Sequence, residues 1–103
     1  MLLSAPEAGK IAQNFLMEEW NISADYKEWF AVIDSRLLGE CWYVVEISLE
    51  GLPDRWFFQV YDTGECDPNY TFSSPISAAD GYTDLKEVPT ILAEVLVSER
   101  NSL

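Results

Sequence analysis

The chain has 103 residues, with 18 aspartates and glutamates against six lysines and arginines and no histidine, which gives a formal charge of −12. So few cations cannot neutralise a phosphate backbone, and the excess of carboxylates is repelled by an anionic bilayer, so neither nucleic acid nor a membrane surface is expected as a partner. Apolar residues make up 49% and aromatic residues 14% of the chain, a composition typical of a folded domain rather than of a disordered acidic tail.

The length predicts one domain, spanning residues 1–103. The first ten residues show no cationic segment followed by an apolar run, so no signal peptide is predicted, and no stretch approaches the ~18 apolar residues of a membrane span. In such a chain Cys41 and Cys66 are expected to be reduced thiols. We therefore expect a cytoplasmic protein, and a monomer.

The first predicted element is a helix over residues 5–20. Ser4 and Glu7 have the spacing of a capping box, and Pro6 suits the first helical turn. The apolar residues that follow have helical spacing: Ala8, Ile11, Ala12, Phe15 and Leu16.

Three strands are expected next, over residues 29–34, 41–49 and 55–62, and residues 69–72 are a candidate for a short fourth strand. Alternation in the second strand divides its residues between an apolar face and a mixed face. An antiparallel hairpin of the second and third strands then matches apolar residues across the pair. The expected partners are Leu49 with Trp56, Ile47 with Phe58 and Val45 with Val60.

Residues 73–82 are rich in Ser, Pro, Ala, Asp and Gly and predict a loop, and a last helix is expected over 89–100. The fold class is therefore α+β: an N-terminal helix, a three- to four-stranded antiparallel meander and a C-terminal helix, with both helices on one sheet face. The other face is expected to carry Val44, Phe57, Tyr61 and Trp42, which makes it a candidate docking surface.

Familiar catalytic sites are not predicted. A Ser or Cys nucleophile normally needs a base such as His, which the chain lacks, and there is neither a paired-cysteine metal motif nor a glycine-rich phosphate loop. The triplet Asp62–Thr63–Gly64 occurs in aspartic proteases, but Glu65–Cys66–Asp67 follows it here, so we interpret it as a turn that ends a strand. We expect a protein that is not an enzyme.

A candidate cation site comes from the predicted meander. The end of strand one, the start of strand two and the end of strand three share one edge of such a sheet. The oxygen-bearing residues expected there are Asp34, Glu40, Asp62, Glu65, Asp67 and Asn69. Calcium takes six to eight oxygen ligands from carboxylates, carbonyls and water, so this group predicts a calcium site. The alternative interpretation is a set of ordinary solvated turn carboxylates.

Residues 80–87 form a second acidic loop, for which turn formation and helix capping compete with a second cation site.

Two family resemblances follow. In size, acidity and helix-plus-sheet character the chain resembles the small acidic calcium-binding proteins of cyanobacteria that lack EF-hands and regulate heterocyst development. Residues 29–34 and 39–45 resemble bacterial immunity proteins that begin with a helix and a meander. The first resemblance implies a calcium buffer or sensor. The second implies an interaction module whose acidic surface neutralises a basic toxin. From the sequence we take calcium binding as the leading hypothesis and binding to a basic protein as the alternative.

Overall fold

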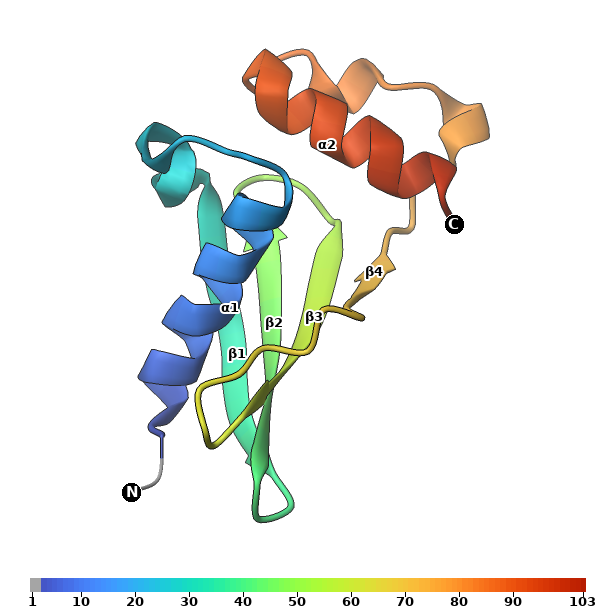
Figure 1. The fold of residues 1–103 in the computed structure, drawn as a ribbon. Helices are drawn as coiled ribbons and strands as arrows, with labels where there is room; N and C mark the ends of the chain where they lie inside the picture. Colours follow the sequence, from blue (N-terminus) through green and yellow to red (C-terminus); the bar gives the residue numbers. More distant parts are fainter. Residues whose placement is uncertain (1–2) are drawn as a thin grey trace.

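The computed structural model describes residues 3–103, so the first two residues of the expected domain lie outside it. Its elements confirm the α+β prediction of a helix, an antiparallel sheet and a second helix (Figure 1). In chain order they are α1 (Ala5–Glu19), η1 (Ala24–Trp29), β1 (Phe30–Leu38), β2 (Trp42–Leu49), β3 (Arg55–Tyr61), β4 (Thr71–Ser73), η2 (Ala78–Asp80), η3 (Thr83–Leu85) and α2 (Thr90–Asn101).

The start of α1 is fixed by the predicted capping box. The Glu7 backbone N–H donates to the Ser4 hydroxyl at 3.3 Å, and the Glu7 carboxylate accepts from the Ser4 N–H at 3.1 Å. These bonds satisfy two of the amide groups that a helix leaves open at its N-terminus. The buried stripe of Ala8, Ala12 and Leu16 then packs α1 against the sheet.

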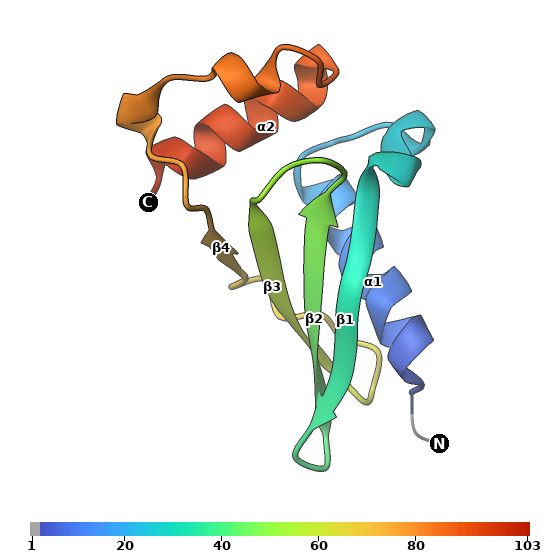
Figure 2. The ribbon, with the colours of Figure 1, turned by 180° about the vertical axis from the view of Figure 1, so that it is seen from behind.

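The four strands form an antiparallel meander in the order β1-β2-β3-β4. Helix α1 covers one face of this sheet, and α2 lies across the end where β2 turns into β3 (Figure 1). Seen from behind, the opposite face carries no helix (Figure 2). We call this uncovered side the open face. The core lies between α1, α2 and the covered face, where Val45, Ile47 and Trp56 are fully buried.

The predicted β2–β3 register is wrong by two residues, although the residues assigned to each face are right. The observed partners are Ile47 with Trp56, Val45 with Phe58 and Tyr43 with Val60. The turn accounts for the shift. The Leu52 N–H donates to the Leu49 carbonyl at 3.1 Å, and Gly51 takes a φ of 81°, so the chain reverses immediately after Leu49. A shift of two residues preserves the side-chain alternation, which is why the apolar faces still match.

Several boundaries also differ from expectation. β1 runs to Leu38 instead of ending at Asp34, because Leu37 and Leu38 pair with β2 and the chain turns only at Gly39. β4 covers Thr71–Ser73 rather than 69–72, and α2 is displaced by one residue at each end. The expected loop 73–82 contains the short helix η2.

The C-terminal helix is attached to the sheet by a buried ion group that the sequence did not predict. Arg100 and Asp54 have fully buried side chains, and the Arg100 guanidinium donates to the two Asp54 carboxylate oxygens at 2.7 and 2.8 Å. It also donates to Asp84 at 2.9 and 3.1 Å. The resulting triad joins α2, the β2–β3 turn and η3. Within residues 3–103, no helix is both long and apolar enough to cross a membrane.

Candidate functional site

Asp34 does not lie where the predicted cation site requires it. It is in the middle of β1, opposite Glu46, and pairs with Arg36 at 3.5 Å. Four further residues separate it from the β1–β2 turn, a distance of about 13 Å along an extended strand. The predicted end of strand one at Asp34 was wrong because Asp34, Ser35 and Arg36 resemble a polar turn in sequence but lie on an edge strand.

The other predicted carboxylates do gather at the far end of the sheet. Glu40 lies in the β1–β2 turn. The Asp62 N–H donates to the Cys41 carbonyl at 2.8 Å, which brings the chain after β3 beside that turn. Gly64 has a φ of 93° and its N–H donates to the Tyr61 carbonyl, so the triplet forms the expected strand-ending turn. We call Glu40, Asp62, Glu65 and Asp67 the acidic turns.

Asp67 already has partners within the protein. One carboxylate oxygen accepts from the Asn69 N–H at 2.8 Å, and the other from the Tyr61 hydroxyl at 3.3 Å. Asn69 itself is exposed. Over the described part of the chain, no three Cys, Asp or Glu side chains converge in a way that could hold a metal ion. The acidic turns are therefore neighbours without forming a ready-made ligand cage.

The open face carries one continuous apolar row next to these turns. Leu38 pairs with Trp42, and Trp42 pairs with Tyr61, so three neighbouring strands each contribute one side chain. We call these three residues the Trp42 row. Leu38 is 45% exposed and Tyr61 36% exposed, and Trp42 is partly exposed between them. The row presents a Trp and a Tyr, the side-chain types most often found at the centre of protein interfaces.

Two carboxylates of the acidic turns, Glu65 and Asp67, border the Trp42 row on the open face. An isolated bridge joins Val60 to Cys66, and both side chains belong to the covered side. Alternation along the chain then places Glu65 and Asp67 on the open side, beside Tyr61. The Asp67 carboxylate raises the pKa of the Tyr61 phenol, with a smaller contribution from Glu65. The phenol of Tyr61 therefore keeps the single proton that it donates to the Asp67 carboxylate.

Elsewhere on the open face, charges compensate each other. Arg55 pairs with Glu46 at 3.2 Å, and Arg36 pairs with Asp34 at 3.5 Å. Asp34, Arg36 and Glu46 lie in the middle of the face, and Arg55 lies at the start of β3, far from the acidic turns. The uncompensated negative charge of this face therefore lies at the end formed by the acidic turns, next to the Trp42 row.

A second polar cluster lies under α2 and was not predicted. The Trp56 indole N–H donates to the Glu99 carboxylate at 2.6 Å, and the Trp20 indole N–H donates to the Tyr70 hydroxyl at 3.2 Å. Burial raises the pKa of Glu99 and that of Tyr70, the latter to about 12. Glu99 and Tyr70 also line a surface groove of about 370 Å³ together with Phe72. The alternation of apolar residues in β3 predicts that Trp56 lies in the core. No local sequence pattern predicts that its indole N–H would bind Glu99 on α2.

Both cysteines are free, as predicted. Cys41 is exposed and Cys66 is partly buried. Burial, with a smaller contribution from Asp67, raises the pKa of the Cys66 thiol to about 11. That thiol is protonated at neutral pH, so it is neither an activated nucleophile nor a ready metal ligand.

The geometry thus singles out the Trp42 row with the bordering acidic turns as the best candidate functional site. Comparisons with protein-family models, with curated proteins and with solved structures find no match for this chain.

Proposed function

We propose that this protein is a non-enzymatic interaction module that binds a basic protein partner through the Trp42 row. The observation that carries the proposal is a coincidence of three features. The sheet has an uncovered face (Figure 2), a row of Leu38, Trp42 and Tyr61 lies on it, and carboxylates without ion pairs lie beside the row. An aromatic anchor with a charged rim is the common arrangement of tight interfaces.

Each part of this surface has a distinct physical role. Trp42 and Tyr61 offer large apolar contact areas and ring faces that attract Arg or Lys side chains of a partner. Glu40 and Glu65 are exposed and make no ion pair in the described chain, so their charges are free to pair with a basic partner. The net charge of −12 adds long-range attraction and speeds the encounter.

The resemblance of residues 29–34 and 39–45 to bacterial immunity proteins supports one class of partner. A basic toxin domain, neutralised by the acidic end of the open face, would combine the aromatic anchor and the charge. The two free cysteines favour a reducing compartment, which fits action in the cytoplasm.

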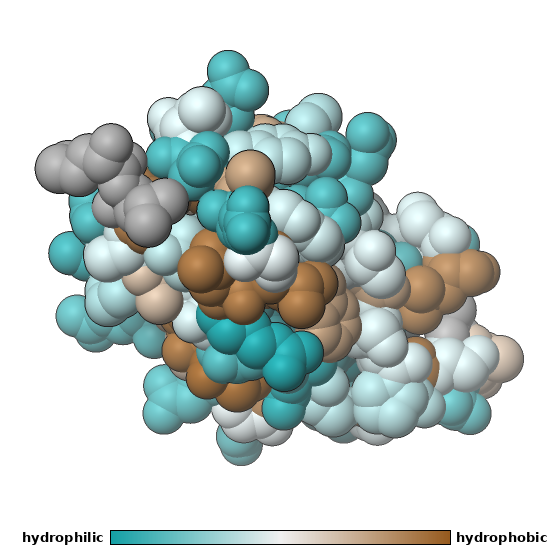
Figure 3. All heavy atoms as spheres, turned by 90° about the horizontal axis from the view of Figure 1, so that it is seen from below, coloured by the Kyte–Doolittle hydropathy of each residue, from teal (hydrophilic) through white to brown (hydrophobic). Residues whose placement is uncertain are grey.

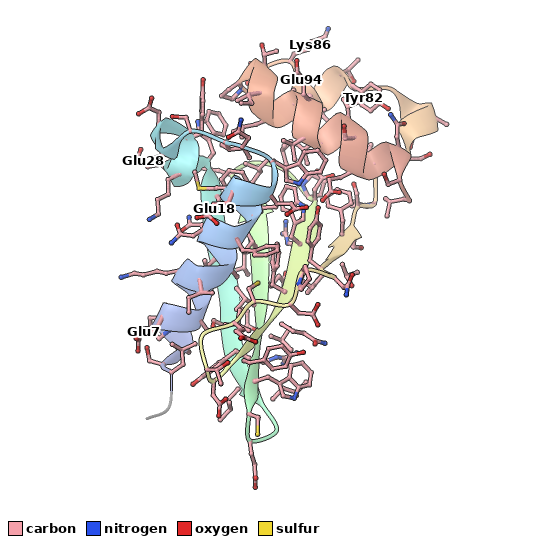
Figure 4. The ribbon with its side chains drawn as sticks, viewed as in Figure 1. Glu7, Glu18, Glu28, Tyr82, Lys86 and Glu94 are labelled. Atoms are coloured by element: carbon pink, nitrogen blue, oxygen red, sulfur yellow. The ribbon has the colours of Figure 1, made fainter. Side chains whose placement is uncertain are left out.

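The test is affinity capture followed by titration. The wild-type protein, Trp42→Ala and the control Tyr82→Ala are immobilised and exposed to lysate, and a basic protein retained at 1:1 stoichiometry is purified and titrated. Tyr82 belongs to the α2 end of the molecule, remote from the acidic turns (Figure 4). We expect Trp42→Ala to weaken binding by roughly 30-fold or more, as for a hot-spot residue, and Tyr82→Ala to leave it unchanged. A partner that binds all three proteins equally would refute this site.

Calcium binding at the acidic turns is a second proposal. It is supported by the proximity of Glu40 and Asp62, which the Asp62 to Cys41 backbone bond brings to adjacent turns. If one ion binds there, Asp62→Asn and Asp67→Asn should each weaken calcium binding strongly, while Asp25→Asn on η1 should not. Saturation at ~100 times the dissociation constant should stabilise the fold by roughly 2.7 kcal/mol.

Calorimetric titration with calcium and then with magnesium decides this second proposal. A silent titration at millimolar calcium would end it, and so would equal small losses of affinity in all three variants, which indicate diffuse screening. A melting shift that sodium of equal ionic strength reproduces would have the same meaning.

A further inference from the structure

β1 forms one edge of the sheet, and its outer side pairs with no strand among residues 3–103. Four of the six large apolar side chains that the structure shows as exposed lie on this strand. They are Val32 at 38%, Ile33 at 48%, Leu37 at 46% and Leu38 at 45%. Monomeric proteins blunt such edges with very short strands, Lys, Pro, other charges or β-bulges. β1 has nine residues and no Lys or Pro, and the devices it does carry are Asp34, Arg36 and one bulge. The opposite edge, β4, has only three residues.

The order of side chains along β1 is self-complementary about Ser35. Asp34 and Arg36 flank Ser35, and Ile33 and Leu37 flank that pair. When two copies pair antiparallel with Ser35 opposite Ser35, each Asp34 meets Arg36 of the second copy, and each Ile33 meets Leu37 of the second copy. Opposite charges and apolar pairs directly across an antiparallel ladder are both stabilising.

Neighbouring registers are unfavourable. Centring the pairing on Arg36 puts two guanidinium groups opposite each other, and centring it on Asp34 does the same with two carboxylates. In a dimer with a two-fold axis perpendicular to the sheet, the covered faces of both copies lie on the same side. When the pairing is centred on one residue, the side chains of each cross-strand pair then point to the same face of the joined sheet. Among the registers centred on Asp34, Ser35 and Arg36, the charges of β1 therefore favour the one centred on Ser35.

The covered side of this edge has room for the second copy. A groove of about 440 Å³ runs between the start of α1 and β1. It is lined by Ala5, Pro6, Gly9, Lys10, Val32, Ile33, Asp34 and Ser35, so its apolar floor has a charged rim. At the inner end of the groove Gly9 lets α1 pack closely on β1, because a Cβ at Gly9 would come within 3.0 Å of Val32. A β-bulge between Val32 and Asp34 leaves Ile33 in the groove lining, so Leu37 of the second copy would enter there. Seen from below, the end of the molecule that carries the β1–β2 turn shows apolar surface near its middle (Figure 3).

We propose that β1 is a dimerisation edge. Two copies pair antiparallel over residues 33–37, centred on Ser35, and join their four-stranded sheets into one continuous sheet. We infer a second copy of this chain as the partner because the order of Asp34, Ser35 and Arg36 is complementary to itself when reversed. The inference is independent of the proposed partner at the Trp42 row, and it replaces the monomer expected from sequence.

Charge-swapped variants test both the dimer and its register. Arg36→Asp places Asp34 of one copy opposite an aspartate of the other, and Asp34→Arg places two arginines opposite each other. We expect sedimentation equilibrium to show a wild-type dimer and each variant alone to dimerise more weakly by roughly tenfold or more. An equimolar mixture of the two variants should form a heterodimer in native mass spectrometry, because both cross-strand pairs are restored.

The rescue by mixing also proves that both variants are folded. Glu94→Arg on α2 is the control and should leave the wild-type dimer intact. The proposal is overturned by a wild-type protein that stays monomeric at the highest concentration studied, by single variants that dimerise as well as wild type, or by a mixture that does not form the heterodimer. A dimer that dissociates only with Trp42→Ala would place the contact on the open face and overturn it as well.

Discussion

Glu99 is a carboxylate held in the core by an indole. Its side chain accepts from Trp56 at 2.6 Å, and the residue is only 8% exposed. Desolvation disfavours the ionised form and raises the pKa of Glu99, while the hydrogen bonds from Trp56 and Tyr70 act in the opposite direction. The folded state therefore binds a proton at Glu99 more readily than the unfolded chain does.

This environment gives stability a defined pH dependence. Because the folded-state pKa of Glu99 is raised, its favourable contribution is complete below the unfolded pKa and is lost as pH rises through the folded pKa. Glu99→Gln keeps an acceptor for Trp56 and removes the titration. We expect the free energy of unfolding of wild type relative to Glu99→Gln to fall as pH rises above the ordinary glutamate pKa, measured by urea denaturation. Glu94→Gln, an exposed change on the same helix, should show no such slope. A relative stability that rises with pH would contradict the assignment.

At the scale of elements, α2 is held to the sheet by the Arg100 triad. Asp54 presents two acceptor oxygens to the guanidinium, and these hydrogen bonds, together with those that Arg100 donates to Asp84, raise the pKa of Arg100 further. The same contact lowers the pKa of Asp84, so the stabilising contribution of Asp84 is present above its unfolded pKa and is lost as pH falls through its folded value. The buried group therefore joins three segments that are distant in sequence.

Removing one charge of this triad should be costly. Asp54→Asn turns an N–H₂ group toward the guanidinium and leaves Arg100 with too little buried negative charge. We expect a loss of roughly 3–5 kcal/mol in the free energy of unfolding, measured by urea denaturation. Asp34→Asn is the matched control: its ion pair with Arg36 is exposed, so the expected loss is about 0–1 kcal/mol. Equal effects of the two substitutions would show that the triad does not anchor α2.

The same elements show what the sequence could predict. Capping residues and periodicity are local, so α1 and the faces of β2 and β3 were predicted correctly. The β2–β3 register was predicted wrongly. It depends on where the chain turns after Leu49, and the residues between the two strands are compatible with more than one turn position. The polar run from Asp34 to Arg36 predicts the end of a strand, but β1 continues through it because an edge strand tolerates polar residues. The Arg100 triad combines residues 54, 84 and 100, and no local pattern links them.

At the scale of the whole molecule, the carboxylates that give the charge of −12 occur along the whole chain, so the proposal depends on which of them act. Glu18, Glu28 and Glu94 lie on α1, η1 and α2, away from the β1–β2 turn (Figure 4). Glu40 and Glu65 lie at the end of the open face beside the Trp42 row. If the charge served only solubility, removing a carboxylate at any position would have a similar effect. At a docking surface, removing a carboxylate near the surface weakens binding more than removing a distant one.

The most direct test of the proposed docking surface compares two double variants of identical net charge. Glu40→Gln with Glu65→Gln removes two charges beside the Trp42 row, and Glu87→Gln with Glu94→Gln removes two from the α2 end. Stopped-flow association and calorimetry with the purified basic partner are run at low and high salt. We expect the first double variant to associate more slowly and bind more weakly at low salt than the second, with the difference shrinking at high salt. Equal losses in both double variants would contradict a local site, since only the total charge would then matter.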